Sequence, residues 1–189
     1  PDSANPGPQL KIFSLPAPPA SAATAAAPPS ICDSRKPMAT TPATVGWLRQ
    51  VWSQKEPVPG LPLAEADYTT LALELAVREV DGWKDVLATQ LGRIENPDRK
   101  GRFQFVMPAL SADPVDRDRW FASLKDVANR RREPWVLEGL NYLHHPLRAE
   151  ASKKYVQPSL DMLWDIQKTG DIFFPKRWLD ATLGGHHSR

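Results

Sequence analysis

The stretch LAEADYTTLALELAVREVDGWKDVLATQLGRIENPD, residues 63–98, decides the fold class. Over 63–80 its apolar side chains recur at spacings of three and four residues, which is the pattern of an amphipathic helix that buries one face. That predicted face consists of Tyr68, Leu71, Ala72, Leu75 and Ala76. Asp81-Gly82 is predicted to end this helix, and the same spacing predicts a second helix over 82–94. The apolar face of the second helix consists of Trp83, Val86, Leu87, Leu91 and Ile94.

Three motifs downstream predict further helix starts. NPD at 96–98, DPVD at 113–116 and EPW at 133–135 each set a proline directly after an acidic or amide residue. Such a residue caps a helix N-terminus, and proline suits the first turn because its missing N–H would have no partner there. We therefore expect a new helix at each motif. Pro108, late in the first of these helices, is expected to bend or shorten it.

Helical patterns continue after Pro146. Residues 147–169 are expected to form two helical segments that meet near Pro158, and Gly170 is expected to stop the second in a left-handed conformation. A last short helix is expected after FFP at 173–175. The seven tryptophans all lie beyond residue 46, and we interpret them mainly as core anchors.

The fold class predicted from these patterns is all-α. No run of the sequence alternates apolar and polar residues with the β-branched enrichment of a strand. The predicted helix starts recur at a spacing typical of helical-hairpin repeats, in which each hairpin leaves an apolar face that the next one covers. We therefore expect an array of antiparallel helix hairpins, HEAT- or armadillo-like, over residues 46–189.

Residues 1–45 differ in composition from the rest of the chain. They contain ten of the twenty prolines and ten alanines, but no glutamate, tryptophan or tyrosine. Such a segment buries too little apolar surface to offset the entropy lost on ordering, so we predict disorder over residues 1–45. A second interpretation is that the segment is not native, because the composition changes abruptly near residue 46, as at a wrongly joined reading frame.

Charge and hydropathy exclude several classes of protein. Lys and Arg number 24 against 22 Asp and Glu, a balance that argues against a nucleic-acid partner. No run of about 18 apolar residues is present, so we expect no membrane span. A single cysteine, Cys32, allows neither an internal disulfide nor a cysteine-cluster zinc site. Prolines interrupt the segment 14–30, so we assign no signal peptide, and the compartment stays open between cytoplasm and cell envelope.

The four histidines form two adjacent pairs. Zinc ligands on a helix lie four residues apart on one face, whereas His144 and His145 are neighbours that point in different directions and precede Pro146. We interpret this pair as a helix end, where histidine also interacts favourably with exposed carbonyls. His186 and His187 follow two glycines, and metal binding is the minor interpretation for them. We predict no catalytic and no metal-ligating residue in this chain.

Basic residues supply the only candidate ligand-binding positions. Arg130, Arg131 and Arg132, together with Lys176 and Arg177, could face a substrate or bind an anionic or carboxylate group. The alternative is structural, because arginines in the last turn of a helix complement its dipole. Both interpretations stay open at this point.

Four segments carry a resemblance to a known family. They are VPGLPLAEADYTTLALELAVREV (58–80), IENPDRKGRFQFVMPALSADPVDRDRWFASLKD (94–126), EPWVLEGLNYLHHPLR (133–148) and TGDIFFPKRWLDATLGGH (169–186). Together they resemble the C-terminal helical region of bacterial zinc aminopeptidases of the aminopeptidase-N-like gluzincin family. The resemblance spans about residues 58–187, and residues 1–45 do not share it.

The resemblance implies a role in peptide hydrolysis, with this chain as a non-catalytic part. Enzymes of the family hold zinc through HExxH and a downstream glutamate, and they bind the substrate amine through a GxMEN segment. Neither motif occurs here, so no catalytic or metal role transfers to any residue, and zinc is expected in the parent enzyme only. The helical region would contact the catalytic metallopeptidase domain, close over its cleft and restrict access of the peptide substrate.

A second interpretation keeps the helical array but not the enzyme. It takes the chain as a free-standing helical-repeat module that binds a protein partner. The family's helical region usually continues beyond the segment that resembles this chain's last residues, so an uncapped array is expected to be marginally stable or to self-associate.

Overall fold

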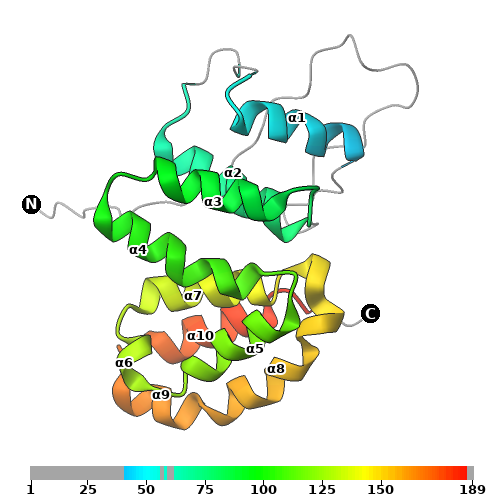
Figure 1. The fold of residues 1–189 in the computed structure, drawn as a ribbon. Coiled ribbons are helices and arrows are strands. Elements are labelled where there is room, and N and C mark those ends of the chain that lie inside the picture. Colours follow the sequence, from blue (N-terminus) through cyan, green and yellow to red (C-terminus); the bar gives the residue numbers. More distant parts are fainter. Residues whose placement is uncertain (1–40, 56–57, 59–61, 187–189) are drawn as a thin grey trace, which may run out of the picture. The chain divides into compact units, whose positions relative to one another are not determined.

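The computed structural model describes residues 41–55, 58 and 62–186, and within them every regular element is a helix (Figure 1). The predicted all-α class is therefore confirmed for this part of the chain. The elements are α1 Pro42–Trp52, α2 Glu65–Val77, α3 Trp83–Arg93, α4 Pro97–Val106, η2 Met107–Leu110, α5 Pro114–Ser123, α6 Val127–Arg130, α7 Glu133–Leu143, η3 Pro146–Arg148, α8 Ala149–Asp161, α9 Leu163–Thr169 and α10 Phe174–Leu183, with η2 and η3 as short 3-10 helices.

The first helix begins inside the segment 1–45 for which we predicted disorder. Thr41 caps α1 by accepting a hydrogen bond from the Thr44 amide, and Pro42 occupies the first turn. Residues 42–45 are thus helical, four residues ahead of the expected boundary at residue 46. The rest of the disorder prediction, together with Cys32, lies outside the described residues.

All three proline motifs start helices as predicted, and two of them do so with the expected side-chain cap. The Asn96 side chain accepts hydrogen bonds from the amides of Asp98 and Arg99, both at 3.0 Å. Asp113 caps α5 in the same way, by accepting from the Val115 amide at 2.8 Å. The shared cause is local, since a short acceptor side chain before proline satisfies the free amides of the first turn.

The third motif starts a helix by a different arrangement. Glu133 is the first residue of α7 and not its cap, and Arg132 precedes it without a side-chain cap. The Glu133 carboxylate instead accepts a hydrogen bond from the Asp171 amide at 2.7 Å. The glutamate therefore joins α7 to the connection before α10.

The end of α2 differs from the sequence-based expectation. Asp81-Gly82 does not end α2, which stops at Val77; there the Glu79 amide donates to the Ala76 carbonyl and the Val80 amide to the Leu75 carbonyl. This is a Schellman motif, in which the residue after the cap takes the left-handed conformation. Glu79 holds that conformation at φ 54°, where glycine or asparagine is usual.

Gly170 was expected to be left-handed, and that expectation is wrong. Its φ and ψ are −104° and 177°, which is extended backbone. The glycine is required for space instead, because a Cβ there would lie 2.5 Å from Phe174 Cδ1. Of the internal prolines, Pro108 shortens α4 into η2 as predicted, whereas Pro158 stays inside α8 and the break falls at Met162.

Helix α7 lies at the centre of the hydrophobic core. It packs against α4 and η2 and also against α10 (Figure 1). Its residues Val136, Leu140 and Leu143 are fully buried. The core cluster also includes large partners from other helices: Trp120, Phe121, Tyr155, Ile166, Phe174 and Trp178.

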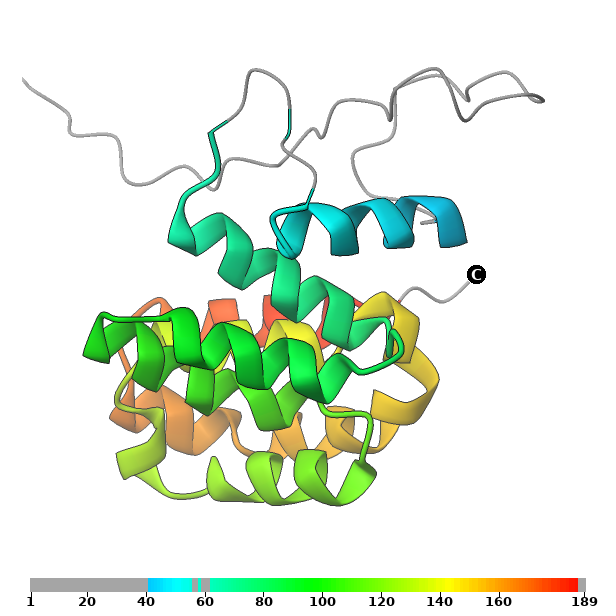
Figure 2. The same ribbon diagram turned by 45° about the horizontal axis from the view of Figure 1, so that its top comes forward.

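Helix α2 is buried over a wider arc than one amphipathic stripe. In addition to the predicted Ala72, Leu75 and Ala76, the side chains of Leu73 and Val77 are buried. The cause is tertiary, since α1 packs on α2 (Figure 2) while α3 and η2 contact it as well. Neighbours on several sides override the simple amphipathic pattern.

The seven tryptophans differ in burial, and Trp47, Trp83 and Trp135 are half-buried. Trp52, Trp120 and Trp178 are buried, as expected for core anchors. Trp164 is 68% exposed, with the Lys168 ammonium 4.8 Å from its ring centroid, so the core interpretation is wrong for this residue.

Close packing at Gly139 gives a test of the core. A Cβ there would lie 2.2 Å from Trp120 Cζ2, so we expect Gly139→Ala to destabilise the fold by about 1–3 kcal/mol. Gly92, inside α3, has open space where a Cβ would lie, so Gly92→Ala should stabilise the fold by about 0.5–1 kcal/mol. Chemical denaturation of both variants measures the difference, and equal effects would contradict the packing argument.

Candidate functional site

The candidate site is a groove of about 580 Å³ formed by residues of α3, η2 and α5 and of the turn between η2 and α5. Most of its surface is apolar, and the apolar side chains are Trp83, Leu87, Met107, Pro108 and Trp120. Local sequence explains one wall, because Pro108 turns the chain into η2, whereas tertiary packing against Gly139 and Phe105 positions Trp120. Its volume lies in the range of small-ligand and side-chain binding sites.

Polar groups gather at the rim of the groove. Asp116 accepts a hydrogen bond from Ser111 Oγ at 2.9 Å and lies 3.7 Å from the Arg119 guanidinium. Lys84 also lines the groove, with its ammonium 5.5 Å from the Trp83 ring centroid. Neither histidine nor cysteine is among the lining residues, so the groove is equipped to bind an apolar group and lacks a nucleophile with an adjacent imidazole base.

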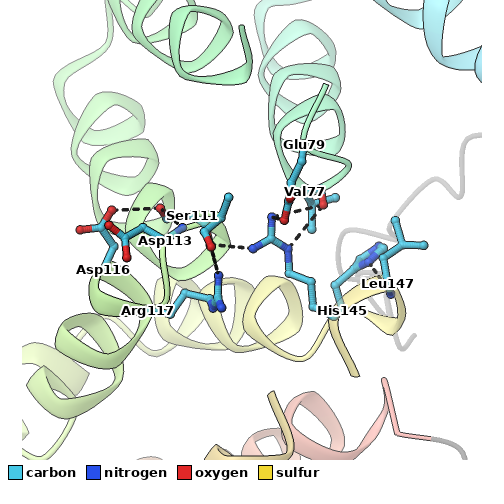
Figure 3. A network of polar contacts seen from close by, with 10 residues as sticks. Val77, Glu79, Ser111, Asp113, Asp116, Arg117, His145 and Leu147 are labelled. Carbon is cyan, nitrogen blue, oxygen red and sulfur yellow. Dashed lines mark hydrogen bonds and ion pairs between the residues drawn. The ribbon is translucent and has the colours of Figure 1, made fainter. Parts of the chain in front are cut away.

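Ser111 and Asp116 form the polar wall of this groove, and a network of buried arginines positions this wall (Figure 3). Arg148 Nη1 donates to the Ser111 carbonyl at 2.6 Å, and its Nη2 donates to the Val77 carbonyl at 3.3 Å. The same guanidinium forms an ion pair with Glu79 at 3.1 Å. Arg117 donates to the Ser111 carbonyl as well, from the side of α5. The Ser111 carbonyl therefore accepts hydrogen bonds from two buried arginines.

Electrostatics at Arg148 follow from this burial. Desolvation lowers the pKa of Arg148 below its ordinary value, the Glu79 carboxylate opposes that change, and the nearby Arg117 adds to it. Arginine nevertheless stays protonated in proteins, so the network holds two positive charges close together. Carbonyl oxygens and one half-exposed carboxylate compensate them.

The basic residues predicted to face a ligand have different partners. Arg130 is buried, donates to the Leu124 carbonyl at 2.8 Å and pairs with Asp165, so its role is structural in this state. Arg131 is exposed at the end of α6. Arg132 pairs with Asp98 and stacks over Trp135 at 4.0 Å.

Lys176 and Arg177 lie on α10. Lys176 pairs with Asp180 at 2.6 Å, and the Arg177 guanidinium lies 5.9 Å from the Phe173 ring centroid. None of the five predicted basic residues lines the groove. Sequence patterns missed Trp83 and Trp120 as groove residues because apolar spacing marks burial and does not distinguish a groove wall from a core.

The first histidine pair forms a helix end, as predicted. His144 caps the C-terminus of α7, and His145 caps η3 by accepting from the Leu147 amide at 3.3 Å. Sequence reasoning missed that His144 pairs with His186, 42 positions away, through nitrogens 2.8 Å apart. Within the described part of the chain, no group of three or more histidine, cysteine, aspartate or glutamate residues is arranged to hold a metal ion.

Comparison with known proteins adds no family assignment. No family model, no curated protein and no solved structure matches this chain. Among the described helices, none combines the length and the apolar character needed to cross a bilayer.

Removal of Arg148 tests the network. Arg148→Met leaves the buried Val77 carbonyl without its arginine donor and the Ser111 carbonyl with Arg117 alone, and we expect a loss of about 2–4 kcal/mol in the free energy of unfolding. Glu79→Gln removes only the half-exposed ion pair, so it should cost less than about 1 kcal/mol. Urea denaturation of the two variants separates the hydrogen bonds from the charge pair, and a Glu79→Gln loss as large as that of Arg148→Met would refute this assignment.

Proposed function

We propose that this chain is the helical region of a zinc-dependent aminopeptidase, where it closes over the catalytic cleft and limits the access of peptides. The observation that carries this proposal is the groove, an apolar surface with two tryptophans and no histidine or cysteine among its lining residues. Such a surface serves binding and not bond cleavage. The four sequence segments that resemble the aminopeptidase helical region supply the enzyme class.

Packing of the helices supports the hairpin array that this proposal requires. Consecutive helices contact each other at α1 with α2, at α2 with α3 and at α9 with α10. Helix α7 additionally contacts α4 and α10, which are distant in sequence. We propose that these pairs are the units of an antiparallel array, in which each pair covers the apolar face of its neighbour.

The chemistry of the groove suits an extended peptide. Aromatic rings offer large, rigid contact area at small entropic cost, and Trp83 and Trp120 both contribute to the lining. Lys84, Arg119 and Asp116 at the rim provide charged partners for the peptide ends or side chains. An apolar peptide side chain would occupy the groove while polar backbone groups meet the rim.

Zinc chemistry is assigned to another part of the parent enzyme. HExxH and GxMEN are absent from this sequence, and the described residues include no cluster of metal-ligating side chains. Their part in the reaction is to shape and restrict the space around a catalytic site that a metallopeptidase domain supplies.

Gene context tests the enzyme assignment. We expect the genomic DNA upstream of this coding region, read in all three frames, to encode HExxH and GxMEN within a few hundred codons. The reason is that the helical region of this family follows its catalytic domain in the same chain. Upstream DNA without either motif would overturn the aminopeptidase proposal and favour a free-standing helical interaction module.

Peptide binding tests the groove directly. Fluorescence of Trp83 and Trp120 should change on titration with short unstructured peptides that carry a central phenylalanine or leucine. Met107→Glu places a charge in the apolar lining, and we expect it to weaken binding about ten-fold, equivalent to about 1.4 kcal/mol.

A matched control separates the groove from the rest of the surface. Val115 is 55% exposed on α5 and does not line the groove, so Val115→Glu introduces the same charge without touching the proposed contact. Its peptide affinity should equal that of the unmodified protein. Equal losses in both variants, or no binding at millimolar peptide, would contradict a peptide-binding groove.

A further inference from the structure

Two histidines far apart in sequence share one hydrogen bond. His144, at the C-terminus of α7, is 1% exposed, and its Nδ1 lies 2.8 Å from Nε2 of His186 in the segment after α10. Their ring centroids are 5.1 Å apart at an interplanar angle of 71°, so the rings meet edge to face. The contact joins the end of α7 to Gly184–His186, which we name the latch segment.

The backbone of the latch segment lies directly against the end of α7. A Cβ at Gly185 would be 1.6 Å from the His144 carbonyl oxygen, so only glycine fits at this position. The Gly184 amide donates to the Asp180 carbonyl and the His186 amide to the Leu183 carbonyl, both at 2.9 Å. The segment thus continues from α10 and covers the His144 backbone.

The protonation state of the two imidazoles decides whether this hydrogen bond can form. A hydrogen bond between two ring nitrogens needs one N–H donor and one unprotonated acceptor, so the pair of nitrogens shares a single proton. If both imidazoles were fully protonated, two N–H groups would point at each other. His144 Nε2 is also buried and has no hydrogen-bond partner among the described residues, so a positive charge on this ring would be poorly compensated.

We propose that the His144–His186 pair is a pH-sensitive latch, which holds Gly184–His186 against α7 at neutral pH and releases this segment on acidification. The device requires three features that occur together: the shared hydrogen bond, a glycine that allows backbone contact, and burial of one imidazole.

The direction of the effect follows from linkage. Burial, and secondarily the charge of His186, lowers the pKa of His144 from its ordinary 6.5 to about 4. Because the closed state binds protons more weakly than the open state, the latch is most stable above pH 6.5. Its stability is lost as the pH falls from about 6.5 toward 4.

Groups on the neighbouring elements set the surroundings of the pair. Tyr155 of α8 packs edge-on against His144, with the ring centroids 6.4 Å apart. The Tyr155 hydroxyl donates to Asp118 of α5, and Asp118 also pairs with Lys154. On α10, Asp180 pairs with Lys176. These carboxylates already have cationic or hydroxyl partners.

His145 is the titratable group most able to interfere with a measurement of the His144 titration. Burial lowers its pKa too, with Arg78 and Arg148 acting in the same direction and Glu74 against them. Its pKa is therefore shifted in the same direction as that of His144. His145→Asn removes this imidazole while an asparagine oxygen can still accept the Leu147 amide, so this variant is the matched control.

Nuclear magnetic resonance of the full chain between pH 8 and 4 tests the latch. We expect the His144 imidazole to titrate far below 6.5 and the His186 amide, corrected for its intrinsic exchange rate, to lose protection at least ten-fold between about pH 7.5 and 4.5. Amides within α7 should keep their protection. A His144 ring that titrates near 6.5, or His186 protection that stays constant over this range, would overturn the proposal.

Two variants open the latch by different routes. His186→Ala removes the partner, and we expect protection of the latch segment at pH 7.5 to fall about five-fold, as for the loss of one hydrogen bond. Gly185→Ala displaces the segment without removing any titratable group. Both should raise the pKa of His144 toward 6.5, whereas His145→Asn should leave it unchanged. A His144 pKa that stays low in both opening variants, or one that rises in His145→Asn, would refute the latch.

Discussion

A buried guanidinium at Arg148 solves the main problem of an all-helical chain, which is where the carbonyl groups of buried helix ends find donors. Arg148 donates to Val77, the last residue of α2, and to Ser111, the residue after η2. These two helix ends are far apart in sequence, and no strand or common helix joins them. One side chain with five donors in a fixed fork suits this position in a way that lysine, with a point charge, would not.

The same network links stability to the groove. Ser111 uses its carbonyl for Arg148 and Arg117 and its hydroxyl for Asp116, which lines the groove beside Arg119. The polar wall is therefore fixed from behind by charges that do not face the groove. A binding surface supported by rigid buried contacts loses little entropy when a ligand arrives, which favours recognition by pre-organisation.

Local signals in the sequence predicted the helix starts well, because Asn96 and Asp113 satisfy amides only two or three residues away. Helix ends were harder to predict. The left-handed Glu79 is stabilised by an ion pair with Arg148, and five α-helices separate these two residues in the sequence. The groove and the His144–His186 contact also depend on packing between distant segments. Residue spacing within one helix contains no information about such partners, so these features could not be predicted.

Helix α7 contributes to both proposed functional features, yet the packing keeps them separate. Trp120 of the groove rests on Gly139, whereas the latch segment contacts His144, more than one turn later on the same helix. Leu140 and Leu143 lie between these points and are fully buried in the core. Because a close-packed interior resists displacement, α7 stays in place whether or not the latch segment is released. Acidification is therefore expected to act on the covering of the His144 end and to leave the proposed peptide-binding groove intact.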